Sequence, residues 1–314
     1  MRIYVAGCGG MLGEAVRRVF GAAADELKCT DIDINAPWLE HCDFRDLNGY
    51  RESVESFAPD VLVHLGAHTD LEYCERNPDD AYRTNTLSVE HAAKIALDND
   101  LPLVYVSTAG IFDGTKARYD ERDLPNPLGV YGRSKYRGEQ IVEAGVLRHL
   151  ICRAGWMMGG GPQKDKKFIG KLMRQLAAGT TTLHVVNDKL GTPTYTVDFA
   201  RNLRALLAAG HFGLYNMVCA GETSRLEVAG ALIDILGLQD KVEIKAVDSG
   251  FFAREYFAPR PASERLLNRK LDQINLNLMR DWRIALAEYI ADYFPPAAKV
   301  FPLRGRRSAD QSLV

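Results

Sequence analysis

The chain has 314 residues, of which 46% are hydrophobic and 25% charged, as in soluble globular proteins with a sizeable core. Its formal net charge of -2 gives no electrostatic reason to expect a nucleic acid or membrane partner, and no apolar run approaches the ~20 residues that span a bilayer. Six scattered cysteines without a Cys-x-x-Cys pair predict free thiols in a reducing compartment, the cytoplasm by default, and neither a disulfide scaffold nor a metal site.

Apolar strands alternate with helices through the first half of the chain. The predicted strands cover residues 2–6, 27–32, 61–65, 103–106 and 150–154, and the predicted helices cover residues 12–20, 50–57, 79–98 and 131–144. Continuous apolar strands separated by helices are typical of a parallel sheet covered on both faces. The sequence therefore predicts an α/β fold with a doubly wound Rossmann sheet, and residues 1–155 as a dinucleotide-binding domain.

The second half of the chain predicts a smaller C-terminal substrate lobe, residues 156–294, interleaved with the first domain. Helices are expected at residues 168–178, 196–209, 225–236 and 286–294, and strands at 182–186, 214–218 and 242–246. The chain is expected to return to the first domain near residues 193–212. Residues 295–314, with a Pro-Pro pair and a basic cluster, are expected to form a poorly ordered tail.

A glycine-rich turn separates the first predicted strand from the first predicted helix. Gly7, Gly10 and Gly13 are spaced as G-x-x-G-x-x-G, with Met11 and Leu12 between the last two. Glycines here permit a tight turn and let the backbone approach a pyrophosphate at the N-terminus of the helix. Between a strand and a helix of an α/β chain, this spacing predicts a nicotinamide dinucleotide site.

Further dinucleotide contacts are predicted where the second and third strands end. Asp31, followed by Ile32, places a carboxylate where it accepts hydrogen bonds from ribose hydroxyls and repels a 2′-phosphate, so NAD(H) is slightly favoured over NADP(H). Asp43 is expected to accept from the adenine amino group while Phe44 packs at the ring. The third strand runs into a stretch expected to pass close to the ribose or nicotinamide: Leu65, Gly66, Ala67, His68 and Thr69.

The stretch from residue 104 to residue 141 carries the predicted catalytic chemistry. A strand ends at Ser107 and Thr108, and on the following helix Tyr131 and Lys135 project from one face. The charge of Lys135 is expected to lower the pKa of the Tyr131 phenol from about 10 toward working pH. Thr108 would hold a carbonyl oxygen against that phenol, which acts as a proton donor. An ordinary surface Tyr and Lys on an amphipathic helix is the alternative.

These motifs resemble those of extended short-chain dehydrogenases/reductases, and most closely the dTDP-4-dehydrorhamnose reductase family, over about residues 1–294. The motifs that add to those above are Ser107-Thr108-x-x-Ile111-Phe112-Asp113-Gly114, Tyr131-Gly132-x-Ser134-Lys135, Arg153-x-x-Trp156, Asn187-Asp188-x-x-Gly191-Thr192-Pro193-Thr194 and Arg260-Pro261-x-Ser263. The resemblance implies NAD(P)H-dependent reduction of the 4-keto group of a nucleotide-diphospho-4-keto-6-deoxysugar. It implies Thr108, Tyr131 and Lys135 as the catalytic set, and substrate contacts from Thr108, Ala109 and Trp156.

Two basic residues of the second half are candidates for the substrate diphosphate. Arg260 has a planar fork that matches phosphate oxygens, and Lys167 lies in a lysine-rich loop. Exposed loop residues are the alternative for both.

The chain departs from the family directly after Thr108. The family usually carries Asp-Tyr there, whereas this chain has Ala109-Gly110, so two polar groups near the sugar are missing. Because 4,6-dehydratases use acidic residues at this place, dehydration is not expected. Two alternative functions stay open: an NAD-dependent sugar nucleotide 4-epimerase and a non-catalytic NAD(P)-binding regulatory subunit. The sequence also leaves open whether the chain forms a homodimer, and which sugar and which nucleotide base the substrate carries.

Overall fold

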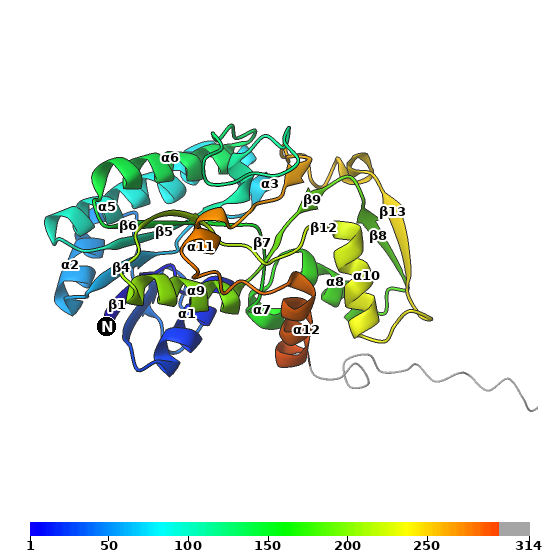
Figure 1. Ribbon diagram of the computed structural model, residues 1–314, viewed down its shortest axis with the longest axis horizontal. Coiled ribbons are helices and arrows are strands. Elements are labelled where there is room, and N and C mark those ends of the chain that lie inside the picture. The colour runs from blue at the N-terminus through cyan, green and yellow to red at the C-terminus, as the bar shows by residue number, and fades with distance from the viewer. Residues whose placement is uncertain (295–314) are drawn as a thin grey trace, which may run out of the picture.

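A seven-stranded parallel sheet forms the larger part of the computed structural model, which describes residues 1–294 (Figure 1). The strand order is β11-β6-β5-β4-β1-β2-β3, and all neighbouring pairs are parallel. The strands are β1 (Arg2–Ala6), β2 (Glu26–Asp31), β3 (Glu40–His41), β4 (Val61–His64), β5 (Leu103–Thr108), β6 (His149–Ala154) and β11 (Gly213–Asn216). The expected tail, residues 295–314, lies outside the described residues.

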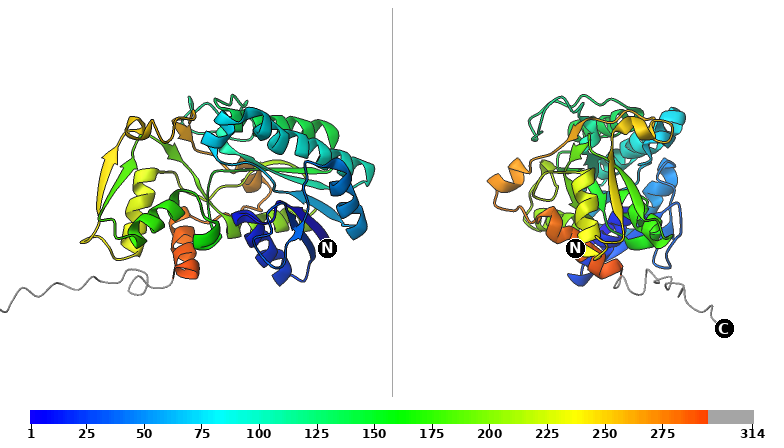
Figure 2. Two further views of the ribbon diagram at one scale, coloured as in Figure 1. Left: turned by 180° about the vertical axis from the view of Figure 1, so that it is seen from behind. Right: turned by 90° about the vertical axis from the view of Figure 1, so that its right-hand side faces the viewer.

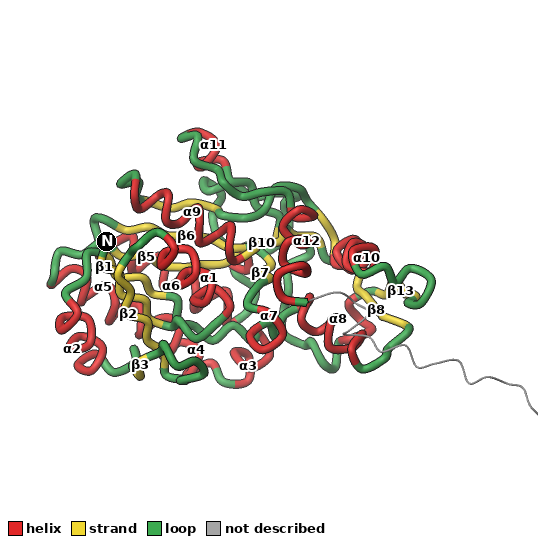
Figure 3. The backbone as a smooth tube through the Cα atoms, turned by 90° about the horizontal axis from the view of Figure 1, so that it is seen from below, coloured by secondary structure: helices red, strands yellow, loops and turns green. Residues whose placement is uncertain are grey.

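Helices cover both faces of this sheet, which confirms the doubly wound α/β class. One face carries α2 (Leu47–Phe57), α5 (Ser88–Asp98) and α6 (Val130–Gly145), and the other carries α1 (Met11–Ala22) and α9 (Thr196–Ala208) (Figure 1). Figure 3 shows α1 and α9 side by side, although they are far apart in the sequence. The chain goes from β1 outward through β2 and β3 and then crosses to β4 on the other side of β1. This reversal opens a crevice at the carboxyl ends of β1 and β4.

The single helix predicted over residues 79–98 is divided in the structure. It consists of α4 (Pro78–Tyr82), a π-helical turn (Arg83–Leu87) and α5, and an unpredicted helix α3 (Leu71–Arg76) precedes it. The wider π turn brings the buried Asn85 amide against the backbone of His68, with hydrogen bonds of 2.7 and 3.0 Å. A tertiary contact therefore overrides the regular helical pattern here.

The smaller part of the molecule is built from short pairs of strands and from helices. The strands are β7 (Trp156–Met158) with β10 (Pro193–Tyr195), β8 (Thr182–Val186) with β13 (Glu243–Val247), and β9 (Leu190–Gly191) with β12 (Thr223–Ser224) and β14 (Ser263–Glu264). The helices are α7 (Gly161–Lys164), α8 (Phe168–Ala177), α10 (Arg225–Ile235), α11 (Arg269–Gln273) and α12 (Trp282–Tyr293), with 3-10 turns at Ala109–Ile111 and Ser249–Phe252. Figure 2 shows the β8–β13 pair and α10 at the end of the molecule away from the N-terminus.

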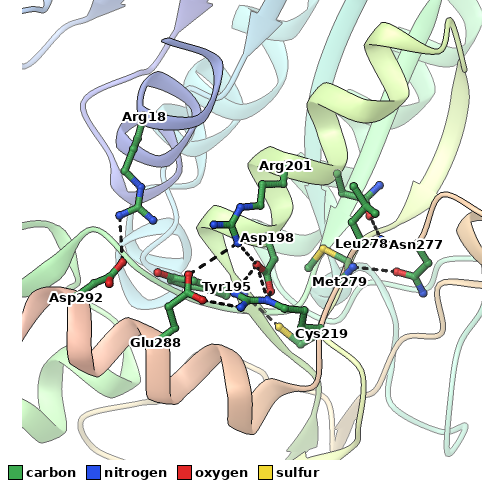
Figure 4. Close-up of polar contacts among 12 residues, drawn as sticks. Arg18, Tyr195, Asp198, Arg201, Cys219, Asn277, Leu278, Met279, Glu288 and Asp292 are labelled. Atoms are coloured by element: carbon green, nitrogen blue, oxygen red, sulfur yellow. Dashed lines mark hydrogen bonds and ion pairs between the residues drawn. The ribbon is translucent and has the colours of Figure 1, made fainter. Parts of the chain in front are cut away.

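Paired charges attach the closing helix α12 to the sheet domain (Figure 4). The buried Asp198 carboxylate of α9 accepts from Arg280 at 2.7 Å and from Arg201 at 3.2 Å. Arg280 also pairs with Glu288 of α12. We call Asp198, Arg201, Arg280 and Glu288 the Asp198 cluster; its charges satisfy one another and hold the two parts together.

The predicted closing helix, residues 286–294, begins earlier in the structure, at Trp282, because the Asp281 side chain caps it by accepting from the Arg283 N–H at 2.8 Å. Within residues 1–294, none of the helices is long and apolar enough to cross a bilayer.

Candidate active site

A cavity of about 1100 Å³ lies over the carboxyl ends of β1, β4 and β5 and continues between the two parts of the molecule. Ligands bind at this place in open α/β sheets, where the strand order reverses. The volume exceeds the roughly 300–1,000 Å³ of ordinary small-molecule sites, as a cavity that holds two ligands together requires.

Nearly all of the site residues predicted from the sequence line this one cavity. They are Gly7, Gly10, Met11, Leu12, Gly13, Asp31, Ile32, Phe44, Leu65, Gly66, Ala67, His68, Thr69, Thr108, Tyr131, Lys135, Trp156, Lys167 and Arg260.

Two predicted residues, Asp43 and Ala109, are not brought to the cavity wall. Both oxygens of the Asp43 carboxylate accept from the Arg45 guanidinium, at 2.8 and 2.9 Å, and these bonds lower the pKa of Asp43. The carboxylate is thus already paired where an adenine contact was expected. Ala109 is buried in the 3-10 turn that follows β5, so its side chain faces the core.

The glycine-rich loop is shaped to receive an anion. Gly7 has a φ of +76°, and a Cβ there would lie 2.3 Å from the Gly66 nitrogen, so the loops after β1 and β4 touch through their backbones. Gly10 is the N-cap of α1, has no side-chain cap bond, and faces open space. Met11, Leu12 and Gly13, the first residues of α1, line the cavity, and no side chain of the described residues caps their N–H groups, as a pyrophosphate site requires.

Asp31 shapes the same loop from the end of β2. Its carboxylate accepts from the Gly9 N–H at 2.8 Å and from the Asp33 N–H at 3.1 Å. A carboxylate has about four lone-pair sites, so acceptor capacity remains for ribose hydroxyls in the cavity. Asp31 thus both holds the turn and offers a negative charge to a ligand.

The close meeting of β5 and α6 brings Tyr131 to Thr108, and Lys135 lines the same cavity from the next turn of α6. Thr108 ends β5, and its hydroxyl accepts from the Gly110 N–H at 3.1 Å. A Cβ on Gly132 would lie 2.3 Å from the Gly110 carbonyl oxygen, so the loop after β5 rests directly on the first turn of α6. This approach places Tyr131 beside Thr108.

Burial controls the charges of the Tyr-Lys pair. It raises the pKa of Tyr131 to about 12, with an interaction with the Thr108 side chain acting in the opposite direction. Burial also lowers the pKa of Lys135 to about 7, although Glu139 opposes the change. The expectation that Lys135 depresses the pKa of Tyr131 is therefore wrong for this structure, in which the Lys135 ammonium lies 4.3 Å above the Tyr105 ring. Tyr131 stays protonated at neutral pH.

The two residues proposed for the diphosphate already have protein partners. The Arg260 guanidinium pairs with Glu72 of α3 at 2.7 Å and donates to the Ala258 carbonyl at 2.9 Å. The Lys167 ammonium donates to the carbonyl and hydroxyl of Thr69, at 2.7 and 2.9 Å, and burial lowers its pKa to about 8. Both contacts join the smaller part of the molecule to the loop and helix after β4.

Three cavity or supporting residues were not found from the sequence. Asn85 fixes His68 and also donates to the Ser134 hydroxyl of α6 at 3.1 Å. Arg225, the first residue of α10, lies 3.7 Å over the Trp156 ring and 4.8 Å from the Phe168 ring. Glu264 accepts from the Trp156 indole. Only Asn85, a poor helix former inside a predicted helix, carried a sequence signal.

Arg225 differs from the other cavity cations. Within residues 1–294, its guanidinium has neither a hydrogen bond nor an ion pair to a protein acceptor. Burial lowers the pKa of Arg225 to about 10, although the charge of nearby Glu264 opposes the change, so Arg225 stays charged at neutral pH. A stacked, preoriented guanidinium with unused N–H groups is suited to binding a phosphate. In contrast, the described residues contain no cluster of side chains arranged to hold a metal ion.

Comparisons with known proteins match nearly the whole described chain to one family. A family model described as RmlD substrate binding domain matches residues 1–294. A dTDP-4-dehydrorhamnose reductase from Mycolicibacterium smegmatis is 31% identical over 293 residues, which cover 92% of this chain and 85% of that protein.

Solved structures of the same fold also match the chain. A dTDP-4-dehydrorhamnose reductase from Clostridium acetobutylicum has a TM-score of 0.84 and 28% identity, covering 93% of this chain and 99% of that one. A reductase of the same name from Bacillus anthracis, solved in complex with NADP, has a TM-score of 0.83 and 25% identity over 93% of this chain and 99% of that chain.

Proposed function

This chain belongs to the RmlD substrate binding domain family, and on that premise we propose that it reduces the 4-keto group of a nucleotide-diphospho-4-keto-6-deoxysugar with NAD(P)H. The family resemblance indicated by the sequence motifs is confirmed by the matches to dTDP-4-dehydrorhamnose reductases. One observation carries the proposed reaction: Thr108, Tyr131 and Lys135 face the same cavity as the glycine-rich loop.

The residues around the loop fit a nicotinamide dinucleotide. The open N-terminus of α1 at Gly10 suits the pyrophosphate, and Asp31 suits the adenosine ribose. The similarity to a reductase solved with NADP supports the same class of cofactor. The Asp31 carboxylate favours NADH over NADPH, and comparing kcat/KM for the two cofactors tests that preference.

The protein residues can carry out the proton chemistry of the reduction. When bound, the reduced nicotinamide supplies the hydride that the ketone carbon accepts. The Thr108 hydroxyl donates a hydrogen bond to the ketone oxygen and orients it, while the protonated Tyr131 phenol gives that oxygen its proton. Lys135 lines the same cavity from the next turn of α6, and with a pKa of about 7 its ammonium is more acidic than the Tyr131 phenol.

The substrate is proposed to lie between Tyr131 and the smaller part of the molecule. Trp156 packs against it, and Arg225 is the better candidate for a phosphate because Arg260 and Lys167 are already engaged. Arg260 and Lys167 are proposed instead to hold the two parts closed around the substrate. The six cysteines are free and buried, which suits a reducing compartment such as the cytoplasm.

The test is to supply the protein with NADH or NADPH and a panel of dTDP-, GDP-, CDP- and UDP-4-keto-6-deoxysugars. Oxidation of the cofactor, followed by its absorbance, with formation of the 4-hydroxy sugar is the expected result. Interconversion of 4-hydroxy sugar nucleotides without net oxidation of added NADH or NADPH would contradict the reductase function and indicate a 4-epimerase. Binding of the dinucleotide without turnover of any sugar would instead favour a regulatory subunit.

A further inference from the structure

The carboxylate of Glu264 lines the cavity near Gly110, two residues after Thr108. Glu264 ends the short strand β14, which pairs with β9, and the neighbouring Ser263 hydroxyl donates to the Ala117 carbonyl at 2.9 Å. The strand pairing fixes the backbone of Glu264, and the hydroxyl bond fixes the residue before it. The half-buried side chain lines the cavity.

Trp156 fixes one oxygen of this carboxylate. The indole N–H donates to Glu264 Oε2 at 2.7 Å. The face of the same indole lies 3.7 Å from the Arg225 guanidinium, so the ring cannot turn without losing that stacking. Because Trp156 is itself held, the orientation of the Glu264 carboxylate is set before a ligand arrives.

The other oxygen points toward the reacting end of the cavity. Glu264 Oε1 lies 3.7 Å from the position that a Cβ on Gly110 would take, and Thr108 Oγ1 lies 3.5 Å from that same position. No donor in residues 1–294 makes a hydrogen bond to Oε1. The unused acceptor and the hydroxyl proposed to hold the ketone oxygen therefore both border the space beside Gly110.

We propose that Glu264 determines substrate specificity by accepting a hydrogen bond from the sugar hydroxyl next to the reacting ketone. This inference rests on the proposed reduction of a 4-keto-6-deoxysugar. In such a hexose the hydroxyl is the one on C3, because the other neighbour of C4 carries the methyl group. Glu264 then supplies the polar group that Ala109 and Gly110 do not, since Ala109 is buried and Gly110 has no side chain.

The chemistry of a carboxylate makes this contact selective. An ionised carboxylate accepts hydrogen bonds and cannot donate them, so it favours a hydroxyl over an ether or carbonyl oxygen at the same place. A substrate without the hydroxyl displaces water from Glu264 Oε1 and donates no hydrogen bond in its place. The transition state of that substrate is therefore stabilised less.

The test compares a dTDP-4-keto-6-deoxyhexose with its 3-deoxy analogue in the wild type and in Glu264→Gln. The amide keeps an oxygen for the Trp156 indole and removes the charge. We expect the wild type to prefer the hydroxylated substrate in kcat/KM by roughly 10- to 100-fold. The variant should lose part of that preference, and through the hydroxylated substrate alone, because its amide can still donate to the hydroxyl but no longer accepts from it with a charged oxygen. Inhibition by dTDP should not weaken, since the substitution removes a negative charge close to Arg225. Glu243→Gln, which removes an exposed carboxylate of the same lobe, is the matched control and should keep the preference.

Two results overturn the proposal for Glu264 while leaving the reductase intact. One is an equal loss of kcat/KM on both substrates, or a parallel loss of dTDP affinity, which would make Glu264 a support for Trp156. The other is an active wild type whose preference the substitution does not change. A wild type that turns over no 4-keto sugar would contradict the proposed function and this inference together.

Discussion

The Asp198 cluster and the cavity around Trp156 both contain charged groups, but they use them in opposite ways. In the cluster, the Asp198 carboxylate is buried and every cation around it contacts an acid (Figure 4). At Trp156, the Arg225 guanidinium is held by aromatic rings, and Glu264 uses only one of its oxygens.

This difference separates structural charges from charges reserved for a ligand. A fully paired cluster gains its stabilisation on folding and has little left to offer a ligand. Stacking orders a charged side chain without consuming its hydrogen bonds, so its binding capacity is kept for a later partner. Substitutions in the two regions should therefore affect different measurements.

The largest expected effect is on the chemical step. Tyr131→Phe removes the phenolic proton and should lower turnover at least ~10²-fold, the share of a general acid. Cofactor affinity should change little, because the phenyl ring keeps the packing. Steady-state kinetics and a titration of NAD(P)H binding check both parts, and unchanged turnover would exclude Tyr131 as the acid.

The next largest effect is on folding. Asp198→Asn removes the buried carboxylate that accepts from Arg280 and Arg201, and should lower the free energy of unfolding by about 1.5–3 kcal/mol, the value of a hydrogen bond to a charged group. Since none of the four cluster residues lines the cavity, kcat and KM of the folded enzyme should stay at wild-type values. Urea denaturation with parallel kinetics measures this, and a shift in KM without a shift in stability would contradict the division of roles.

Arg225→Met should show the reverse pattern. It removes the cation while keeping an apolar stem between the rings, so the inhibition constant of dTDP should rise roughly 10- to 100-fold, the value of one or two charge-assisted hydrogen bonds. Stability should change little because no ion pair is broken. Arg283→Met is the matched control, since Arg283 also stacks on a tryptophan, 4.4 Å from the Trp282 ring, outside the cavity lining. Equal dTDP affinity in both variants would argue against the phosphate site.

Per pH unit, the smallest effect is the one on the pH dependence of stability. Burial holds the pKa of Lys135 at about 7 in the folded protein, against 10.5 as its ordinary value. Between these pH values the unfolded chain binds a proton that the folded chain does not, so this residue makes stability rise with pH, by at most about 1.4 kcal/mol per unit.

Lys135→Met removes that contribution. Its unfolding free energy should therefore rise less between pH 7 and pH 10 than that of the wild type, as measured by denaturation at several pH values. Parallel curves for the two proteins would show that Lys135 is not destabilised by burial.

Much of the sheet domain was predictable because its signals are local. The continuous apolar strands, the glycine spacing and the four-residue separation of Tyr131 and Lys135 depend on neighbours in the chain. The errors arise where distant segments meet. The π turn at Asn85 forms because its side-chain amide makes hydrogen bonds to the backbone of His68. The high pKa of Tyr131 comes from its burial among elements that are far apart in the sequence.

The sequence by itself determined the alternation of strands and helices in the sheet domain, the glycine turn before α1 and the position of Tyr131 and Lys135 one turn apart on a helix. These follow from backbone periodicity and from short-range spacing. Only the tertiary structure decided that Arg260 is paired with Glu72, that Arg225 is not paired, and that Glu264 lies near Thr108. Partners of charged side chains are set by contacts between residues far apart in the chain, and composition and spacing carry no record of them.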